Sequence, residues 1–266
     1  MISVAVSGAR GRMGSCVVDA VSGADDLRLV GCFDPRHAGE AVETSDGTFL
    51  CASDLSAMLD EARPDVMVDF SQPDAALANV RCALAHGVHV VLGTTGVSAQ
   101  ELERAWRESS ASGAKLFFAP NFTTGAILMM QFAKLAAAYF GDAEIIEMHH
   151  DGKRDAPSGT AVQTARLMGE ARGHVANLGP GPESEVSGYE GARGCAEDGV
   201  RIHSVRGAGF MASQEVILSS LGQTLTIRHD STQRESYMPG VLLAVRNVTG
   251  MSEGFAVGLE RFMGLA

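Results

Sequence analysis

The sequence contains few aromatic residues for a chain of 266 residues, and it contains no closely spaced pair of cysteines. One Trp, three Tyr and eleven Phe argue against a binding surface built from stacked aromatic rings. The cysteines are an odd number, widely spaced, with no Cys-x-x-Cys pair: Cys16, Cys32, Cys51, Cys82 and Cys195. We therefore expect neither a disulfide framework nor a zinc site, and we expect a reducing cytoplasm as the location.

Long hydrophobic runs and an excess of basic residues are also missing. Apolar stretches such as 126–130 and 241–245 are far shorter than the roughly 20 residues that cross a bilayer. The N-terminal apolar run breaks at residues 8–12, so we expect no signal or transit peptide. With 21 Lys+Arg against 32 Asp+Glu, the formal net charge is −11, which disfavours nucleic acid and anionic membranes as partners.

The first 120 residues alternate strand-like and helix-like segments. Hydrophobic residues make up 45% and glycines number 31, which is typical of a globular chain with many tight turns. The expected strands are 2–6, 27–33, 66–70, 88–92 and 115–119, and the expected helices are 12–21, 54–61, 74–86 and 98–110. This alternation predicts a doubly wound parallel sheet of the Rossmann type, with right-handed crossovers.

The rhythm changes near residues 121–125, where we place a domain boundary. An apolar helix (125–140), a strand (144–150) and a second helix (158–171) precede a loop rich in Gly and Pro (173–199). Three further runs then predict strands, and a last helix closes the chain: 201–205, 214–219, 223–228 and 237–247. The sequence therefore predicts an α/β chain with a second, α+β domain that contains a mixed sheet.

A glycine-rich loop directly follows the first expected strand and opens a helix. Gly11 and Gly14 have the spacing of the last two glycines of the G-x-G-x-x-G fingerprint, with Ala9 at its first position. Asp34 ends the next strand, where a carboxylate can accept a hydrogen bond from an adenosine ribose. The alternative is an ordinary turn with a surface carboxylate, but the combination favours binding of a dinucleotide at a helix N-terminus.

Two more strand-to-loop junctions carry small polar residues. Gly93, Thr94 and Thr95 follow one strand. Ala119, Pro120, Asn121 and Phe122 follow the next one. Because ligands bind beyond the carboxyl ends of parallel strands, we expect both junctions to line the nicotinamide half of the cofactor site, with Phe122 as an apolar wall.

A cluster of polar residues in 147–161 is the densest chemical signal. His149 and His150 fall where a strand ends, and Lys153 follows a flexible turn. Ser158 then begins a helix whose first N–H groups can bind a carboxylate. The cluster supplies a proton donor, a cation and an anion site, which suits reduction of a small acidic substrate. The alternative is a capped helix after a surface loop with solvated histidines.

These motifs resemble the dihydrodipicolinate reductase family. The resemblance rests on the runs 147–153 and 155–161, on residues 11–14, 93–96 and 120–122, and on the tail runs 203–206, 229–231 and 238–241. It covers essentially the whole chain. One departure is Pro35 after the acidic Asp34, where some members carry Arg, and it leaves the choice between NADH and NADPH open.

The resemblance implies NADH- or NADPH-dependent reduction of a dihydrodipicolinate-type dicarboxylate to tetrahydrodipicolinate in the diaminopimelate and lysine pathway. It implies a nucleotide domain (1–122 and 232–266), a substrate and oligomerisation domain (123–231), and a homotetramer. Its implied catalytic residues are His149 and Lys153, and its substrate residues are His150, Ser158, Gly159 and Thr160. The implied cofactor contacts are Gly8, Ala9, Arg10, Gly11, Arg12, Met13, Asp34, Gly93, Thr94, Thr95, Ala119, Pro120, Asn121 and Phe122; no metal is expected.

Two other functions deserve comparison. A dehydrogenase of the aspartate-semialdehyde type needs a cysteine nucleophile beside a base, and no cysteine lies near the His149–Lys153 cluster in the sequence. A nucleotide-sensing module without catalysis would keep the glycine loop but would not need that cluster. Both therefore explain the residues less completely than a reductase does.

Overall fold

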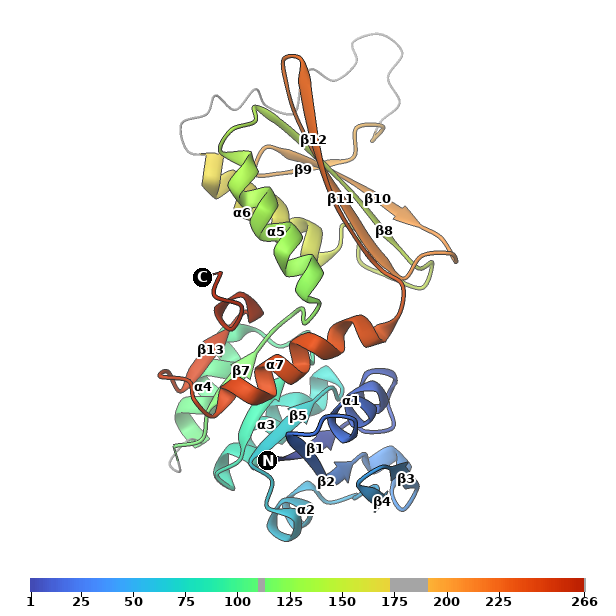
Figure 1. Ribbon diagram of the computed structural model, residues 1–266, viewed down its shortest axis with the longest axis vertical. Helices are drawn as coiled ribbons and strands as arrows, with labels where there is room; N and C mark the ends of the chain where they lie inside the picture. Colours follow the sequence, from blue (N-terminus) through green and yellow to red (C-terminus); the bar gives the residue numbers. More distant parts are fainter. Residues whose placement is uncertain (110–112, 173–190, 266) are drawn as a thin grey trace. The chain divides into compact units, whose positions relative to one another are not determined.

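The computed structural model describes residues 1–109, 113–172 and 191–265. The chain forms two compact units, one made of Met1–Thr123 with Tyr237–Ala266 and the other of Thr124–Ser236. Each unit is built around its own main sheet (Figure 1). The last segment of the chain thus belongs to the first unit, and the second unit is an insertion between its two parts.

The first unit contains a six-stranded parallel sheet in the order β13-β7-β6-β5-β1-β2. Its strands are β1 (Ile2–Ser7), β2 (Leu27–Phe33), β5 (Val66–Asp69), β6 (His89–Leu92), β7 (Leu116–Phe118) and β13 (Phe255–Val257). β5 and β1 lie in the middle of the sheet and are mostly buried, and their residues are mainly apolar, with Ser3, Ser7 and Asp69 as the exceptions. The prediction of a parallel sheet is confirmed.

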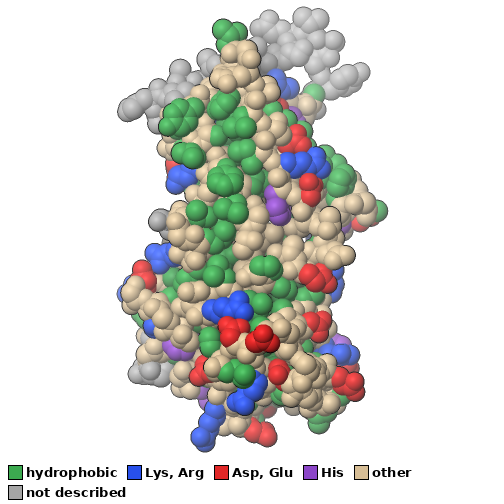
Figure 2. All heavy atoms as spheres, in the orientation of Figure 1, with side chains coloured by type: hydrophobic (Ala, Val, Ile, Leu, Met, Phe, Trp, Pro, Cys, Tyr) green, Lys and Arg blue, Asp and Glu red, His purple; other side chains and the backbone are tan. Residues whose placement is uncertain are grey.

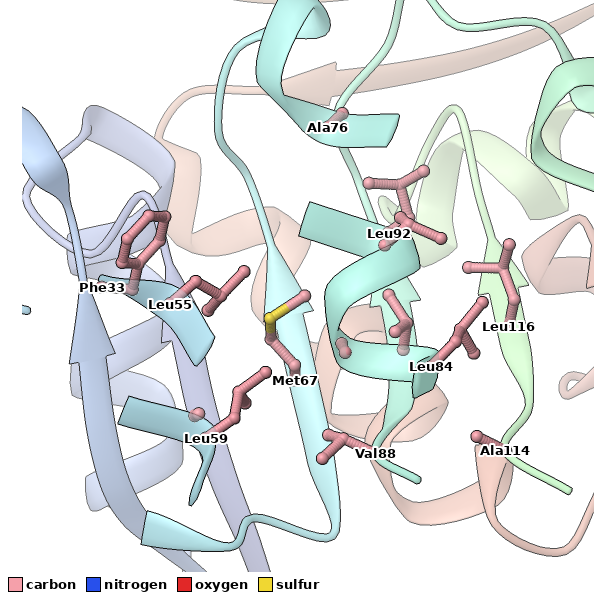
Figure 3. Close-up of a cluster of buried hydrophobic side chains, with 14 of the residues drawn as sticks. Phe33, Leu55, Leu59, Met67, Ala76, Leu84, Val88, Leu92, Ala114 and Leu116 are labelled. Carbon is pink, nitrogen blue, oxygen red and sulfur yellow. The ribbon is translucent and has the colours of Figure 1, made fainter. Parts of the chain in front are cut away.

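Helices cover both faces of this sheet. They are α1 (Arg12–Ser22), α2 (Leu55–Ala62), α3 (Pro73–Ala85), α4 (Ala99–Ser109) and α7 (Met238–Val248). α1 packs against α7 on one face, while α2, α3 and α4 form a row on the other. Leu59, Leu84 and Leu116 are buried between that row and the sheet (Figure 3). The arrangement is the doubly wound one that the alternation of segments predicts.

Three strands of this unit were not predicted from the sequence. β3 (Ala41–Thr44) and β4 (Gly47–Leu50) form a small antiparallel hairpin, and β13 pairs with β7 at the edge of the main sheet. The hairpin strands are largely exposed and carry little apolar alternation. β13 has only three residues, which is too short to produce a periodic signal.

The second unit contains a five-stranded mixed sheet in the order β12-β11-β8-β10-β9. Its strands are β8 (Asp142–His149), β9 (Cys195–Glu197), β10 (Val200–Arg206), β11 (Ala212–Ser220) and β12 (Gln223–Ser231). β8 and β10 are parallel, and the other neighbours are antiparallel. The mixed sheet is therefore confirmed. β9 lies inside the segment expected to be a loop, and residues 173–190 of that segment lie outside the described residues.

Helices α5 (Thr124–Ala137) and α6 (Gly159–Arg172) pack against each other and against this sheet. The buried side chains of Ile145, Val216 and Leu218 alternate with more exposed ones, so they share the face that the helices cover. On α5, Phe132 and Leu135 are exposed. Hydrophobic side chains gather over this helix in Figure 2. Among the described residues, no helix is both long and apolar enough to cross a membrane.

Candidate active site

The glycine-rich loop of the first unit leaves no room for side chains. Gly8 has a positive φ of +77°, and a Cβ there would lie 2.7 Å from the carbonyl oxygen of Phe70. A Cβ at Gly14 would lie 1.9 Å from the carbonyl oxygen of Gly8. Because both obstacles are backbone atoms, these two positions require glycine, as a tight turn into α1 demands.

The amino end of α1 is suited to an anion. Its N-cap is Gly11, which supplies no side-chain hydrogen bond, and its first turn contains no acidic residue. The first N–H groups of a helix have no partner within the helix, and its dipole favours negative charge at this end. Together with the close backbone approach at Gly8, this end fits a pyrophosphate.

Asp34 lies beside the glycine loop, at the end of β2. Its Oδ2 accepts a hydrogen bond from the backbone N–H of Arg10 at 3.2 Å, and its Oδ1 accepts from the N–H of Arg36 at 3.3 Å. The Arg10 guanidinium forms an ion pair with Glu40 at 3.2 Å. The sheet therefore places Asp34, which is expected to bind the ribose, next to the loop that is expected to bind the pyrophosphate.

Hydrogen bonds between successive strand ends place the other expected loops along the same edge. The N–H of Gly8 donates to the carbonyl of Phe33, that of Gly93 to Asp69, and that of Ala119 to Leu92. The four junctions follow β1, β2, β6 and β7. This edge is the carboxyl end of the parallel sheet, where open α/β sheets bind their ligands.

A buried carboxylate that the sequence analysis did not single out supports these loops. Asp69 is fully buried at the end of β5. Its Oδ1 accepts hydrogen bonds from the hydroxyls of Ser71 and Thr94, both at 2.8 Å, and its Oδ2 accepts from the amide of Asn79 at 2.9 Å. The Thr94 hydroxyl is therefore occupied inside the protein, and Thr94 shapes the loop through Asp69.

Two residues of the last junction also have structural partners. Phe122 is 1% exposed, and its ring packs against those of Phe70 and Phe117 with centroids 5.8 and 6.3 Å apart. The side-chain oxygen of Asn121 accepts a hydrogen bond from the N–H of Thr123 at 2.8 Å. Phe122 thus supports the loop from within the core, and its contact with a cofactor stays a prediction.

In the second unit, His149 is the last residue of β8 and is held by a carboxylate. Its Nδ1 lies 2.5 Å from Oε2 of Glu147, which is two residues earlier and therefore on the same face of the strand. The Glu147 side chain is fully buried, while the His149 side chain is 15% exposed. The imidazole is thus oriented by one nitrogen and has a partly open surface.

Glu147 has two further partners. The guanidinium of Arg206 donates to both of its carboxylate oxygens at 2.9 and 2.8 Å, and the N–H of Ser158 donates to Oε1 at 3.2 Å. Burial alone would raise the pKa of this carboxyl, but the hydrogen bonds from His149, Arg206 and Ser204 outweigh it and lower the pKa to about 2. Glu147 is therefore ionised throughout the physiological range.

Lys153 is paired through a short turn. Its ammonium lies 2.8 and 2.9 Å from the two carboxylate oxygens of Asp155, and this ion pair lowers the pKa of Asp155. The Asp155 carbonyl accepts a hydrogen bond from Arg206 at 2.7 Å. Arg206 thus connects the lysine turn with the carboxylate that holds His149.

The amino end of α6 completes the group. Ser158 is its N-cap, because its hydroxyl accepts a hydrogen bond from the N–H of Ala161 at 3.2 Å. A Cβ added at Gly159 would meet nothing within 4 Å, so the helix end is open there. Thr160 is partly exposed in the same turn, and its hydroxyl could donate to a carboxylate bound at this helix end. The helix end expected to bind an anion is therefore open at Gly159 and tied to Glu147 through Ser158, and its binding of a substrate carboxylate stays a prediction.

The structure links most of the expected residues of this unit but leaves one aside. His150 is exposed, and its carbonyl accepts a hydrogen bond from the N–H of Lys153 at 3.1 Å. A role for its ring in holding substrate stays a prediction. In the described ranges, no group of three or more His, Cys, Asp and Glu residues is arranged to hold a metal ion.

Neither Glu147 nor Arg206 has a role that was predicted from the sequence. The spacing of Glu147 and His149 on a strand is a usable signal, because residues two apart share a face. Arg206 gives no local signal, since its place opposite His149 arises only from the parallel pairing of β10 with β8.

Comparison with known proteins covers both units. Residues 2–122 match the family model described as "Dihydrodipicolinate reductase, N-terminus", and residues 125–263 match the one described as "Dihydrodipicolinate reductase, C-terminus". The 4-hydroxy-tetrahydrodipicolinate reductase of Thermobifida fusca is 49% identical over the full length of both chains. The enzyme of that name from Mycolicibacterium smegmatis is 45% identical over 99% of both chains.

A solved structure is similar to the whole chain as well. It is a dipicolinate-bound dihydrodipicolinate reductase from Paenisporosarcina sp. TG-14, with a TM-score of 0.84 and 38% sequence identity. The match covers 98% of the present chain and 99% of the other.

The lowered pKa of Glu147 predicts a pH dependence of stability. Because its folded-state pKa is about 2 and the ordinary value about 4.5, the carboxylate adds stability above pH 4.5 that is lost as the pH falls toward 2. Relative to Glu147→Gln, the wild type should lose about 2 kcal/mol of unfolding free energy between pH 7 and pH 3. Urea denaturation of both proteins across this range measures it, and a constant difference would contradict the assignment.

Proposed function

Because the chain belongs to the dihydrodipicolinate reductase family, we propose that His149 is the general acid of its reaction and that Lys153 anchors a substrate carboxylate. The enzyme is a pyridine-nucleotide-dependent oxidoreductase that produces tetrahydrodipicolinate in the diaminopimelate and lysine pathway. The observation that carries the proposal is the network through Glu147 and Arg206, which links His149, the Lys153 turn and the amino end of α6.

The reduction places a hydride on one ring carbon and a proton on its neighbour. The hydride would come from a nicotinamide cofactor bound by the first unit. His149 suits the proton donor, because imidazole changes charge near neutral pH and its ring is oriented through Nδ1 by Glu147. A donor held in this way needs no reorganisation when the proton is transferred.

Lys153 and the α6 terminus suit the carboxylates of the substrate. The ammonium has three donors, and its two contacts with Asp155 leave at least one for a substrate oxygen. The open helix end at Gly159, with the hydroxyl of Thr160, provides a second anion site. The similar structure from Paenisporosarcina holds dipicolinate, which supports a small dicarboxylate as the ligand of this chain.

The described geometry also addresses the cysteine-dependent alternative. Cys16, Cys32, Cys51 and Cys82 belong to the first unit. Cys195 lies on β9 and pairs with Ile202 of β10. His149 pairs with Arg206, which lies four residues further along β10. Family membership favours acid catalysis by a histidine over a thiol nucleophile, and Cys195, the cysteine of the second unit, pairs four residues before Arg206 along β10.

The chemistry makes a direct prediction for two variants. His149→Gln should lower kcat by about 10²- to 10⁴-fold with a smaller rise in KM, because it removes the proton donor. Lys153→Ala should lower kcat and raise KM, since binding of the substrate carboxylate stabilises both the ground state and the transition state. Steady-state kinetics with tetrahydrodipicolinate formation, followed as NADH oxidation at 340 nm, measures both.

The control for these variants is direct NADH binding by fluorescence, which neither change should weaken. The double variant should lose less activity than the two single losses together, because the groups act as one unit. If His149→Gln keeps a kcat near that of the wild type between pH 6 and 9, another group is the acid.

We further propose that both NADH and NADPH serve as donors, with NADH at least as effective. Asp34, placed beside the glycine loop, favours a ribose hydroxyl and repels a 2′-phosphate. Arg12 belongs to the glycine loop and Arg36 lies two residues after Asp34, and both are exposed. A guanidinium at either position can pair with a 2′-phosphate.

The cofactor proposal is tested by Asp34→Asn, which removes the charge and keeps the size. Binding of NADH should weaken, while that of NADPH should change little or improve. Parallel titrations of the two cofactors into wild type and variant give the ratio of dissociation constants. An unchanged ratio would show that Asp34 does not contact the ribose.

We also propose that the enzyme is a homotetramer assembled through the second unit, as expected from the family resemblance. Ile146, Val205 and Ile217 alternate with the side chains that α5 and α6 cover, so they lie on the opposite face of the sheet, and all three are at least partly exposed. A sheet face with exposed apolar side chains is a frequent site of association.

Light scattering coupled to gel filtration tests the assembly. The mass at micromolar concentration should be about four times 27.8 kDa. Val205→Glu, which places a charge on the apolar face, should reduce this mass. A stable monomer of the wild-type protein would refute the proposal.

A further inference from the structure

We propose that Glu147 is a positioning residue that holds His149 and the amino end of α6 in the geometry needed for proton transfer. The inference rests on the proposed role of His149 as the acid. Glu147 is the one residue that contacts both His149 Nδ1 and the Ser158 N–H within the described part of the chain, and it has no exposed surface.

The contact with His149 decides which ring nitrogen faces the substrate. An ionised carboxylate has no proton, so at 2.5 Å the Nδ1 must donate to Oε2 of Glu147. The proton available for transfer is then on Nε2, which is the only other nitrogen of the ring. A histidine without this contact could place its mobile proton on either nitrogen and could rotate about its side chain.

Arg206 keeps the charge of Glu147 balanced during the reaction. When the imidazolium gives its proton to the substrate carbon and becomes neutral, Glu147 loses one positive partner. Its paired hydrogen bonds from Arg206 remain, and an arginine does not lose its charge at accessible pH. The carboxylate therefore stays ionised and ready to support reprotonation of His149 from solvent.

The third contact extends the effect to substrate binding. The Ser158 N–H that donates to Oε1 of Glu147 belongs to the N-cap of α6. Gly159 and Thr160 follow directly, so the same carboxylate sets the position of the helix end that suits a substrate carboxylate. One buried side chain thus connects the acid with the anion site.

Another glutamate of the same strand offers a matched control. Glu144 also lies on β8 and also pairs with a histidine and an arginine, His203 at 2.7 Å and Arg193. It lies five residues away from His149, nearer the other end of the strand. A loss of activity caused only by disturbing an ion pair of β8 should therefore appear with Glu144→Gln as well.

The experiment is a double-mutant cycle with Glu147→Gln, His149→Gln and the double variant. Glu147→Gln should lower kcat about 10- to 100-fold with a smaller change in KM, as expected for a group that orients another. In the His149→Gln background, the same change should cost less than about threefold, because its target is gone. Glu144→Gln should leave kcat within about twofold of the wild type.

Three results separate the outcomes. Equal losses of kcat from Glu147→Gln in both backgrounds, or losses equal to those of Glu144→Gln, would overturn the positioning role. A near-normal kcat of His149→Gln would instead overturn the proposed function. If Glu147→Gln does not fold, Glu147→Asp keeps the charge for Arg206 but shortens the reach to His149, and the same cycle with this variant decides the question.

Discussion

A buried carboxylate can remain ionised only if the surrounding protein supplies hydrogen-bond donors. In the second unit, the arrangement of β8, β10 and α6 depends on one such carboxylate, that of Glu147. Its charge lies without solvent contact and is met by His149, by the two terminal nitrogens of Arg206 and by a backbone N–H. Removing one partner of such a group leaves an uncompensated charge, which costs several kcal/mol. The network therefore specifies one arrangement of β8, β10 and α6, and that arrangement carries the candidate chemistry.

The first unit repeats this principle with a different carboxylate. Asp69 is buried at the end of β5 and receives hydrogen bonds from Ser71, Thr94 and Asn79. These donors come from α3 and from the loops after β5 and β6. A rigid edge of this kind suits nucleotide binding, because backbone groups must be held in place before the ligand arrives. In both units a buried carboxylate accepts hydrogen bonds from several loops and helix ends and so fixes their positions.

Local patterns predicted most of the fold. The alternation of apolar runs and helical segments indicated the parallel sheet, and the Gly8–Gly14 loop, Asp34 and the Ser158 cap were each visible as short-range signals. These features depend on steric limits and hydrogen bonds between residues close in sequence. The small β3–β4 hairpin and the edge strand β13 were missed, because short or exposed strands produce no apolar periodicity.

The sequence by itself determined the βα rhythm, the glycines that a tight turn requires, and the grouping of His149 and Lys153 within one short stretch. Only the tertiary structure decided that Arg206 lies opposite His149, that the Thr94 hydroxyl donates a hydrogen bond to Asp69, and that Phe122 is buried. The reason is physical. Steric and capping preferences act over a few residues, whereas strand register and the pairing of buried charges join segments that meet only when the sheets form.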